Sequence, residues 1–372
     1  MTSNQLFEAY LQEKLDIRIS SGLYRTLVHA TSKIDFSSND YFGFSKLLAI
    51  SEINQEQDAA GATGSRSITG NSLLAEDTER MIAKFHNAEA ALIFNCGYMA
   101  NVGLFSCIAT KGDTFISDEY IHASIIDGMR LSHASRVKFK HNDLLDLEKK
   151  LQLITGKKIV AVESIYSMDG DEAPLKEIAA LCKKYEAILI VDEAHATGVF
   201  GDKGEGLINK YNLMQEVFAC TYTFGKAIGL HGAVVVGSQT LRHYLINNAR
   251  AFIYTTALPP YLYLQLQSAY AALPNADRNK LHALITYFKK VAETLQPLCF
   301  IKSNSAIQGI IIGDNFKAKV LAETLFAKGF YVRPILSPTV PVGTERIRIC
   351  LHVFNTFDEV NALMQAINEQ LS

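Results

Sequence analysis

Short apolar runs, separated by helix-like stretches, make up the middle of the chain. The runs stand at residues 90–94, 113–117, 158–164, 187–195, 217–223 and 232–237. Between them, the segment 174–186 has apolar residues three and four positions apart, which is typical of an amphipathic helix. Runs that are apolar throughout suit strands covered on both faces, so the pattern predicts an α/β domain with a mostly parallel sheet. Ligands of such sheets bind at the carboxyl ends of the strands.

The C-terminal part of the chain predicts a smaller α/β domain. Residues 305–313 and 345–352 have the pattern of strands, and 317–329 that of an amphipathic helix. Thr356 and Glu359 are spaced as a capping box before the last helix. We therefore expect an N-terminal arm at 1–45, a large domain at 46–260 and a small C-terminal domain at 261–372.

Composition and charge exclude several classes of protein. The chain has 372 residues, with 36 Lys and Arg against 38 Asp and Glu, so neither a nucleic acid nor a membrane is an expected partner. The 6 cysteines are scattered without a CxxC pair, which predicts reduced thiols and no metal site. The charged N-terminus does not resemble a signal peptide, and no window resembles a membrane span. These features predict a cytoplasmic protein.

Polar residues able to carry chemistry stand where the predicted strands end. They are Glu163, Ser164, Asp192, His195, Thr223 and Lys226. Each alone has an ordinary explanation: an aspartate can cap a helix, a histidine can sit in a core, and a lysine can belong to a surface loop. Together they place a carboxylate, an imidazole, hydroxyls and an amine at one edge of the sheet.

This set of groups fits pyridoxal phosphate. The cofactor needs an amine for a Schiff base, which Lys226 supplies, and a carboxylate to keep its ring nitrogen protonated, which Asp192 supplies. Thr223 and the backbone N–H groups of the turn CGYMAN (96–101) are candidates for the phosphate. An ordinary strand-to-helix turn is the alternative reading of that segment. The P-loop, GxGxxG, HExxH and GxSxG motifs are missing, which disfavours nucleotide, nicotinamide, zinc-peptidase and hydrolase chemistry.

A series of motifs, from about Ser21 to the C-terminus, resembles the α-oxoamine synthases in order and spacing. The motifs are SSNDYFGFS, GATGSRSITGN, DEYIHAS, SMDGDEAPL, VDEAHATGVFG, TFGKAIG, RAFIYTTALPP and PTVPVGTERIRICL. The resemblance implies a fold-type-I pyridoxal-phosphate-dependent transferase that joins an amino acid to an acyl thioester and releases carbon dioxide. It also implies a homodimer in which the loop 61–70 reaches toward the partner's cofactor.

The resemblance assigns roles around the cofactor ring. It implies that Lys226 forms the Schiff base and moves protons at the substrate α-carbon, and that Asp192 pairs with the ring nitrogen. It places His195 on the ring oxygen O3′ and His122, in DEYIHAS, on the face of the ring. His133, in the near-copy LSHAS, is expected on a helix or its surface instead.

Further contacts to the cofactor follow from the same resemblance. They are Glu163, Ser167, Thr223 and the turn formed by Cys96, Gly97 and Tyr98. The alternatives are a packed aromatic for Tyr98 and a strand-end hydrogen bond for Glu163.

The resemblance also implies contacts to both substrates. Arg348 and Asn39 match the groups that hold the amino-acid carboxylate, and Arg25 lies where related enzymes have a basic residue near the distal carboxylate of the acyl chain. The alternatives are a strand arginine facing water, together with Arg346, and an exposed arginine in the arm. Leu336 stands where the family commonly has an arginine, with Arg333 three residues earlier.

Within the family, the motifs most resemble the biotin-pathway member, which condenses L-alanine with a pimeloyl thioester of coenzyme A or acyl carrier protein. Serine palmitoyltransferase, glycine C-acetyltransferase and 5-aminolevulinate synthase types remain alternatives. So do two other classes, a nicotinamide-dependent oxidoreductase and a non-catalytic partner subunit. Retention of Lys226, Asp192 and His195 together argues against the non-catalytic subunit.

Overall fold

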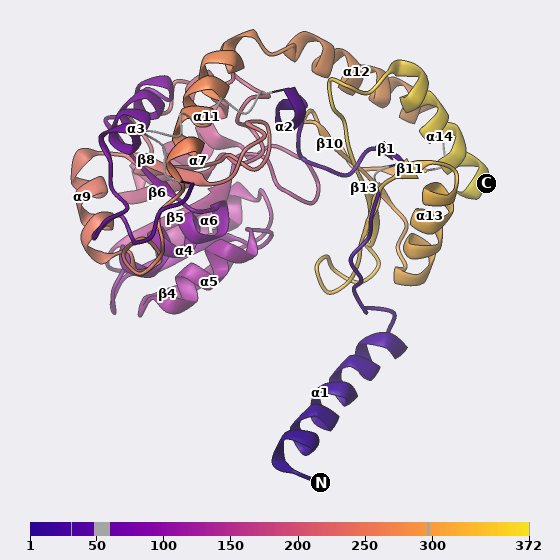
Figure 1. Ribbon diagram of the computed structural model, residues 1–372, viewed down its shortest axis with the longest axis horizontal. Coiled ribbons are helices and arrows are strands. Elements are labelled where there is room, and N and C mark those ends of the chain that lie inside the picture. The colour runs from indigo at the N-terminus through magenta and orange to yellow at the C-terminus, as the bar shows by residue number, and fades with distance from the viewer. Residues whose placement is uncertain (31, 48–59, 296–297, 372) are drawn as a thin grey trace.

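The computed structural model describes residues 1–30, 32–47, 60–295 and 298–371, and its largest part is an α/β body built on one sheet (Figure 1). In this part of the chain the sheet has seven strands in the order β2-β8-β7-β6-β5-β3-β4, and β8 alone runs antiparallel to its neighbours. The strands are β2 (Ala90–Phe94), β3 (Thr114–Asp118), β4 (Ser135–Phe139), β5 (Lys158–Glu163), β6 (Ala187–Asp192), β7 (Ala219–Thr223) and β8 (Ala233–Gly237).

Helices cover both faces of this sheet, which is why its strands are apolar throughout. In β5, Ile159 and Ala161 belong to one buried cluster, and Val160 and Val162 to the other. One face is covered by α4 (Gly97–Cys107), α5 (Ala123–Leu131), α9 (Gln239–Asn248) and α10 (Arg250–Ile253). The other is covered by α3 (Leu73–Phe85), α6 (Leu144–Leu153), α7 (Leu175–Lys184), α8 (Leu207–Lys210) and α11 (Pro260–Ala272). The predicted mostly parallel sheet is confirmed.

The edge strand β4 was not predicted from the apolar pattern. Its residues Ser135, Arg136 and Lys138 are exposed, because β4 pairs only with β3 and carries charge at the edge of the sheet. His133 lies in the exposed turn between α5 and β4, so it is on the surface as expected but not on a helix. The helix has already ended, since Ser132 is extended and its hydroxyl donates to the carbonyl of Met129.

A second, antiparallel sheet carries the C-terminal part of the chain, with strands in the order β12-β13-β10-β9. Its elements are β9 (Cys299–Phe300), β10 (Ile307–Ile311), β12 (Arg333–Ile335), β13 (Arg346–Cys350), α12 (Arg278–Thr294), α13 (Asn315–Ala327) and α14 (Phe357–Leu371), with a 3-10 turn at Leu273–Asn275. Reciprocal hydrogen bonds between Thr356 and Glu359 confirm the capping box before α14. Close to this sheet, β1 (Ile34–Asp35) pairs with β11 (Phe330–Tyr331), and the short α2 (Phe44–Leu47) follows. The two domain boundaries stay predictions.

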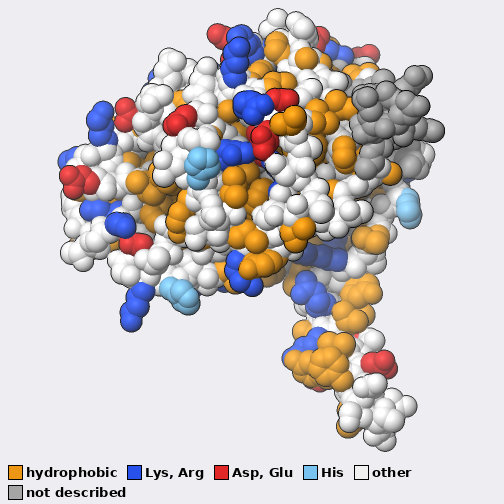
Figure 2. All heavy atoms as spheres, turned by 60° about the vertical axis from the view of Figure 1, so that its left-hand side comes forward, with side chains coloured by type: hydrophobic (Ala, Val, Ile, Leu, Met, Phe, Trp, Pro, Cys, Tyr) orange, Lys and Arg blue, Asp and Glu red, His pale blue; other side chains and the backbone are white. Residues whose placement is uncertain are grey.

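The first helix, α1 (Ser3–Ser20), stands clear of the rest of the molecule (Figures 1 and 2). It has no buried residue, and large apolar side chains are exposed along it, including Phe7, Tyr10 and Leu11. Within the described ranges, none of the helices combines the length with the apolar character that a membrane span requires. A helix with this exposure gains no stability from packing on its own chain.

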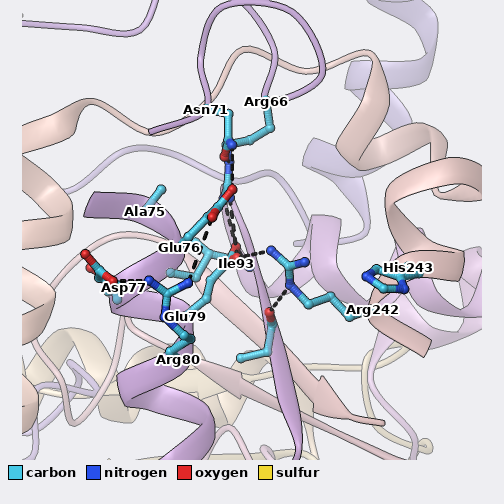
Figure 3. A network of polar contacts seen from close by, with 12 residues as sticks. Arg66, Asn71, Ala75, Glu76, Asp77, Glu79, Arg80, Ile93, Arg242 and His243 are labelled. Carbon is cyan, nitrogen blue, oxygen red and sulfur yellow. Dashed lines mark hydrogen bonds and ion pairs between the residues drawn. The ribbon is translucent and has the colours of Figure 1, made fainter. Parts of the chain in front are cut away.

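Figure 3 shows how the glycine-rich loop 61–70 is anchored beside the large sheet. Glu79, on α3, accepts hydrogen bonds from Arg66 of the loop at 2.8 Å, from Arg242 of α9 at 2.8 Å and from the backbone N–H of Ile93 at 3.0 Å. Only 2% of the Glu79 side chain is exposed. One buried carboxylate therefore holds the loop, a helix and an edge strand together.

Glu79→Gln is expected to lower the free energy of unfolding by about 3 kcal/mol, because two arginines lose a buried counter-charge. Urea unfolding followed by circular dichroism measures the difference. The matched control is Asp77→Asn on the same helix, where the ion pair with Arg80 is exposed and the expected loss is below about 1 kcal/mol. Equal losses in the two variants would contradict the larger contribution expected of the buried network.

Candidate active site

A pocket of about 800 Å³ lies where residues of the large sheet's carboxyl edge meet those of the C-terminal sheet. Seven of the site residues predicted from the sequence line it: Arg25, Asn39, His122, Ser167, His195, Lys226 and Arg348. They come from segments more than three hundred residues apart in the chain. The fold therefore brings together residues that were selected separately by motif.

Lys226 sits in the turn between β7 and β8, with its amine against His195. The Nζ atom lies 2.8 Å from Nε2 of His195. Burial lowers the pKa of Lys226, and the nearby carboxylates of Asp192 and Glu163 oppose that shift. Gly229, at φ +68°, closes the turn through its N–H to the Lys226 carbonyl. A lysine held this way loses its proton more readily than one on a solvated face.

Asp192 ends β6 and is fixed by two hydrogen bonds. Oδ1 accepts from the N–H of Ala194 at 2.9 Å, and Oδ2 accepts from Nδ2 of Asn101 at 2.7 Å. Asn101, on α4, also donates to Ser124 of α5. Asn101 belongs to the quoted turn CGYMAN, yet its role was missed because an asparagine inside a helical pattern gives no signal of its own.

His122 is both a pocket residue and the N-cap of α5. Its Nδ1 accepts from the N–H of Ser124 at 3.2 Å and lies 2.7 Å from the hydroxyl of that residue. Burial lowers the pKa of His122; the Asp192 carboxylate opposes this shift, and the Lys226 ammonium adds to it. The cap fixes the orientation of the ring at the pocket wall.

Ser167 lines the pocket just after β5, and Glu163 ends that strand. Glu163 Oε2 accepts from the N–H of Ser167 at 3.2 Å, whereas Oε1 is buried without a hydrogen-bond partner among the described residues. Burial raises the pKa of Glu163, and the neighbouring charge of Asp192 raises it further. The strand-end hydrogen bond is present, and it leaves one oxygen of Glu163 to be satisfied.

The turn formed by Cys96, Gly97 and Tyr98 opens α4 beside Thr223. Cys96 is the N-cap, so the first N–H groups of this 11-residue helix have no partner within it. A Cβ atom on Gly97 would lie 3.3 Å from the Thr223 hydroxyl, so the helix start and Thr223 form one cradle. Tyr98 is 43% exposed and its hydroxyl contacts Asp127, so it is not the packed aromatic of the alternative. The cradle suits an anion such as a phosphate.

Arg348 is held by neutral groups only. Its Nε donates to the Ser167 carbonyl at 2.7 Å, Nη2 to Asn39 Oδ1 at 3.0 Å and Nη1 to Cys350 Sγ at 2.9 Å. Among the described residues, no carboxylate lies within ion-pair distance of it. Two residues earlier on β13, Arg346 forms an ion pair with Asp169. Both arginines are buried, so the alternative in which they face water is wrong, and the charge of Arg348 is open to an anionic ligand.

The outer end of the pocket is basic. Its charged lining residues are Arg18, Arg25, Lys319, Arg333 and Glu323. Arg25 is exposed and reaches the pocket, which is compatible with both of its predicted readings. Lys319 and Arg18 were missed because each lies within a helical pattern, where a lysine or arginine usually faces solvent.

His141 forms a charged bridge next to the pocket that the sequence reading also missed. Its Nδ1 lies 2.9 Å from Asp118 at the end of β3, and its Nε2 lies 2.8 Å from Asp171, just beyond Ser167. The ring stacks on Tyr120. Burial opposes the charged form, but the hydrogen bonds to Asp118 and Asp171 outweigh it and raise the pKa of His141 to about 9.

Because the pKa of His141 is raised on folding, its stabilisation is greatest at low pH. The contribution is complete below the ordinary histidine pKa of about 6.5, falls as pH rises and is lost at about pH 9, with a total of about 3 kcal/mol. We expect His141→Gln to lower the free energy of unfolding at about pH 6 and to change it little at about pH 10. A difference between wild type and variant that is the same at both pH values would contradict this bridge.

Pyridoxal phosphate fits this arrangement of donors. Lys226, Asp192 and His195 meet at one sheet edge, the start of α4 forms an anion cradle with Thr223, and Glu163 keeps one buried oxygen without a partner. A lysine and an aspartate on neighbouring strand ends, with an anion cradle nearby, are the groups that pyridoxal phosphate requires, in agreement with the fold-type-I transferase that the resemblance implies.

Comparison with known proteins agrees with this class. Residues 31–367 match the family described as aminotransferase class I and II. An 8-amino-7-oxononanoate synthase of Emericella nidulans is 39% identical, covering 91% of this chain and 89% of that protein. The structure of a serine palmitoyltransferase from S. paucimobilis, with a bound PLP–myriocin aldimine, superposes with a TM-score of 0.89 and 27% identity over 100% of this chain and 98% of that one. The structure of an 8-amino-7-oxononanoate synthase from Francisella tularensis superposes with a TM-score of 0.81 and 31% identity, over 92% of this chain and 98% of that one. The chain therefore belongs to the aminotransferase class I and II family and, within it, to the α-oxoamine synthases.

Proposed function

We propose that this protein uses pyridoxal phosphate to condense L-alanine with a pimeloyl thioester, giving 8-amino-7-oxononanoate, carbon dioxide and the free thiol carrier in biotin synthesis. A C–C bond forms between the alanine α-carbon and the thioester carbonyl, the C–S bond breaks, and the alanine carboxylate leaves as carbon dioxide. The observation that carries the proposal is a single pocket that joins Lys226 to an unpaired Arg348 and opens toward a basic end. The relatives at up to 39% identity support the same reaction.

Different residues of the inner pocket would bind the amino acid and move its α-proton. When bound, pyridoxal phosphate supplies an electron sink that makes the α-proton acidic. Arg348 and Asn39 hold the alanine carboxylate and orient the α-carbon. Lys226 takes the α-proton and returns one at the end, a task that its lowered pKa suits. Asp192 would hold the proton on the ring nitrogen, and His195 would face the ring oxygen.

Other residues of the site would anchor the cofactor. The N–H groups at Gly97 and Tyr98, after the N-cap Cys96, would bind the phosphate together with Thr223. His122 would cover one face of the ring. Ser167 and Glu163 would complete the opposite wall, where Oε1 of Glu163 needs a partner.

The basic end of the pocket supports an acyl substrate with an anionic group. Arg18, Arg25, Lys319 and Arg333 are opposed there by Glu323 alone among the charged lining residues. Pimelate has a distal carboxylate, and coenzyme A and acyl carrier protein both carry phosphate. Either anion would be attracted to this end.

The reaction is tested by supplying the cofactor-loaded protein with pimeloyl-coenzyme A and L-alanine, L-serine or glycine in separate assays. Thiol release is followed by absorbance and the product by mass spectrometry. We expect 8-amino-7-oxononanoate from alanine and little product from the other two amino acids. Palmitoyl-coenzyme A, which lacks the distal carboxylate, is the control acyl donor. A preference for serine with palmitoyl-coenzyme A would overturn the proposal.

That outcome corresponds to the second candidate, a serine palmitoyltransferase type. It is favoured by one observation, the higher TM-score of 0.89 for the S. paucimobilis enzyme against 0.81 for the F. tularensis synthase. Sequence identity favours the synthase instead, since it is 31% for the F. tularensis synthase and 27% for the S. paucimobilis enzyme. The assay above separates the two candidates by amino acid and acyl chain.

We infer that the protein acts as a homodimer. The exposed apolar side chains of α1 and the loop 61–70, which Glu79 anchors beside the sheet, are the features that support a second copy. Light scattering of the purified protein tests this, and a monomer at working concentration would contradict it. The cytoplasmic location stays a prediction.

A further inference from the structure

Tyr41 lies between the two halves of the pocket, although no role was assigned to it from the motif SSNDYFGFS. Its side chain is fully buried, and its hydroxyl lies 2.7 Å from Nδ1 of His195. The same hydroxyl is 3.5 Å from Oδ1 of Asn39, at the long end of hydrogen-bond distances. Its backbone carbonyl accepts from Val353, just after β13, so the ring is tied to the C-terminal sheet.

These contacts make Tyr41 the centre of a chain of five side chains. On one side, Nε2 of His195 lies 2.8 Å from Nζ of Lys226. On the other, Oδ1 of Asn39 accepts from Nη2 of Arg348 at 3.0 Å. The chain therefore runs from the lysine that would act on the α-carbon to the arginine that would hold the substrate carboxylate.

The chain has a definite arrangement of protons. Burial and the charges of Lys226, Arg348 and His122 lower the pKa of His195, so its ring is neutral and has one N–H. While the Lys226 ammonium donates to Nε2 of His195, the single ring proton of His195 is on Nδ1. Nδ1 then donates to the Tyr41 oxygen, and the Tyr41 O–H points to Asn39. If Nε2 becomes the donor, the Tyr41 O–H turns to Nδ1 and leaves Asn39.

We propose that Tyr41 is a positioning residue that sets the tautomer of His195 and links that ring to the Asn39–Arg348 end of the pocket. The proposal rests on the proposed function only in taking Arg348 as the group that binds the amino-acid carboxylate. Without the hydroxyl, Nδ1 of His195 is buried with no partner, and Asn39 loses a donor. The ring then has no fixed tautomer.

The test compares Tyr41→Phe with Tyr270→Phe in the cofactor-loaded protein. Tyr270 is a matched control because it is 3% exposed and its hydroxyl also meets a histidine, lying 3.2 Å from Nε2 of His86, outside the pocket lining. The first measurement is the ¹⁵N spectrum of the histidine rings, with His195 assigned through His195→Gln. We expect Tyr41→Phe to move the His195 signals and Tyr270→Phe to leave them in place.

The second measurement is alanine binding without thioester, followed by the visible absorbance of the cofactor. The dissociation constant is expected to rise about tenfold in Tyr41→Phe and to stay unchanged in Tyr270→Phe. If Tyr41→Phe leaves both the His195 signals and the dissociation constant for alanine unchanged, the proposal is overturned and Tyr41 is a packing residue. Absence of alanine binding in the wild type would instead overturn the proposed function, and the nitrogen spectrum would still decide the role of Tyr41.

Asn39→Ala provides a second, independent variant. With Tyr41 present and the cofactor removed, so that the Lys226 amine lies against Nε2 of His195, it is expected to move the His195 signals, because it removes the acceptor for the tyrosine O–H. In the Tyr41→Phe background it is expected to add no further change. If Asn39→Ala in the wild-type background leaves the His195 signals in place, the proposal is overturned, even if Tyr41→Phe does not fold.

Discussion

Replacement of Lys226 by alanine is expected to lower kcat by more than about a thousandfold, because one side chain supplies both the covalent link to the cofactor and the base at the α-carbon. The geometry favours both tasks: Nζ is 2.8 Å from a neutral imidazole, and burial lowers the pKa of the amine. Thiol release from pimeloyl-coenzyme A at saturating alanine measures the loss.

A second readout separates the covalent link from turnover. Borohydride reduction of the cofactor-loaded protein, followed by peptide mass spectrometry, is expected to mark Lys226 in the wild type and no residue in Lys226→Ala. Lys149→Ala, on the exposed face of α6, is the control and should keep both the label and the rate. A variant without Lys226 that kept more than about a tenth of the wild-type rate would remove this residue from the mechanism.

The sheet and its active edge could be predicted from the sequence because both follow from local patterns. The strand 158–163 is apolar on both faces because helices cover it on both sides, and Asp192 and Lys226 end neighbouring strands. Edge strand β4 escaped the same reasoning, since its solvent-exposed Arg136 and Lys138 interrupt the apolar pattern.

The contacts that join distant segments could not be predicted. His141 bridges Asp118 and Asp171, which lie 23 and 30 residues from it, and no periodicity marks such a pairing. Tyr41 is 154 residues from His195 in the chain, so the motif SSNDYFGFS gave no sign of the partner of its tyrosine. Local patterns report burial and the type of element, whereas these contacts depend on how the two sheets are placed.

Arg346 and Arg348 illustrate the same limit within one strand. They alternate onto the same face of β13 and are both buried, yet Arg346 has the carboxylate of Asp169 and Arg348 has only neutral acceptors. From the sequence, the alternative reading placed both arginines on one solvent-exposed face of the strand. In the structure, the charge of Arg346 is compensated by Asp169, whereas the charge of Arg348 has no counter-ion and can bind an anionic ligand.

This difference leads to opposite expectations for the two lysine variants. Arg348→Lys is expected to raise KM for alanine about 100-fold, equivalent to about 3 kcal/mol, because an ammonium cannot replace a planar fork that binds a carboxylate through two N–H groups. The KM for the pimeloyl thioester should stay within about threefold. The melting temperature should fall less than in Arg346→Lys, since Arg348 has hydrogen bonds to neutral acceptors but no counter-ion to lose.

Arg346→Lys should show the reverse pattern, with a lower melting temperature that reflects the weakened pair with Asp169. Steady-state kinetics with each substrate varied in turn, together with thermal melts of the cofactor-loaded variants, tests both expectations. If Arg348→Lys leaves the alanine KM unchanged while the melt shifts down, Arg348 is a structural residue and the carboxylate is held elsewhere. A buried charge without a counter-ion destabilises the free fold, and binding of the substrate carboxylate offsets that cost.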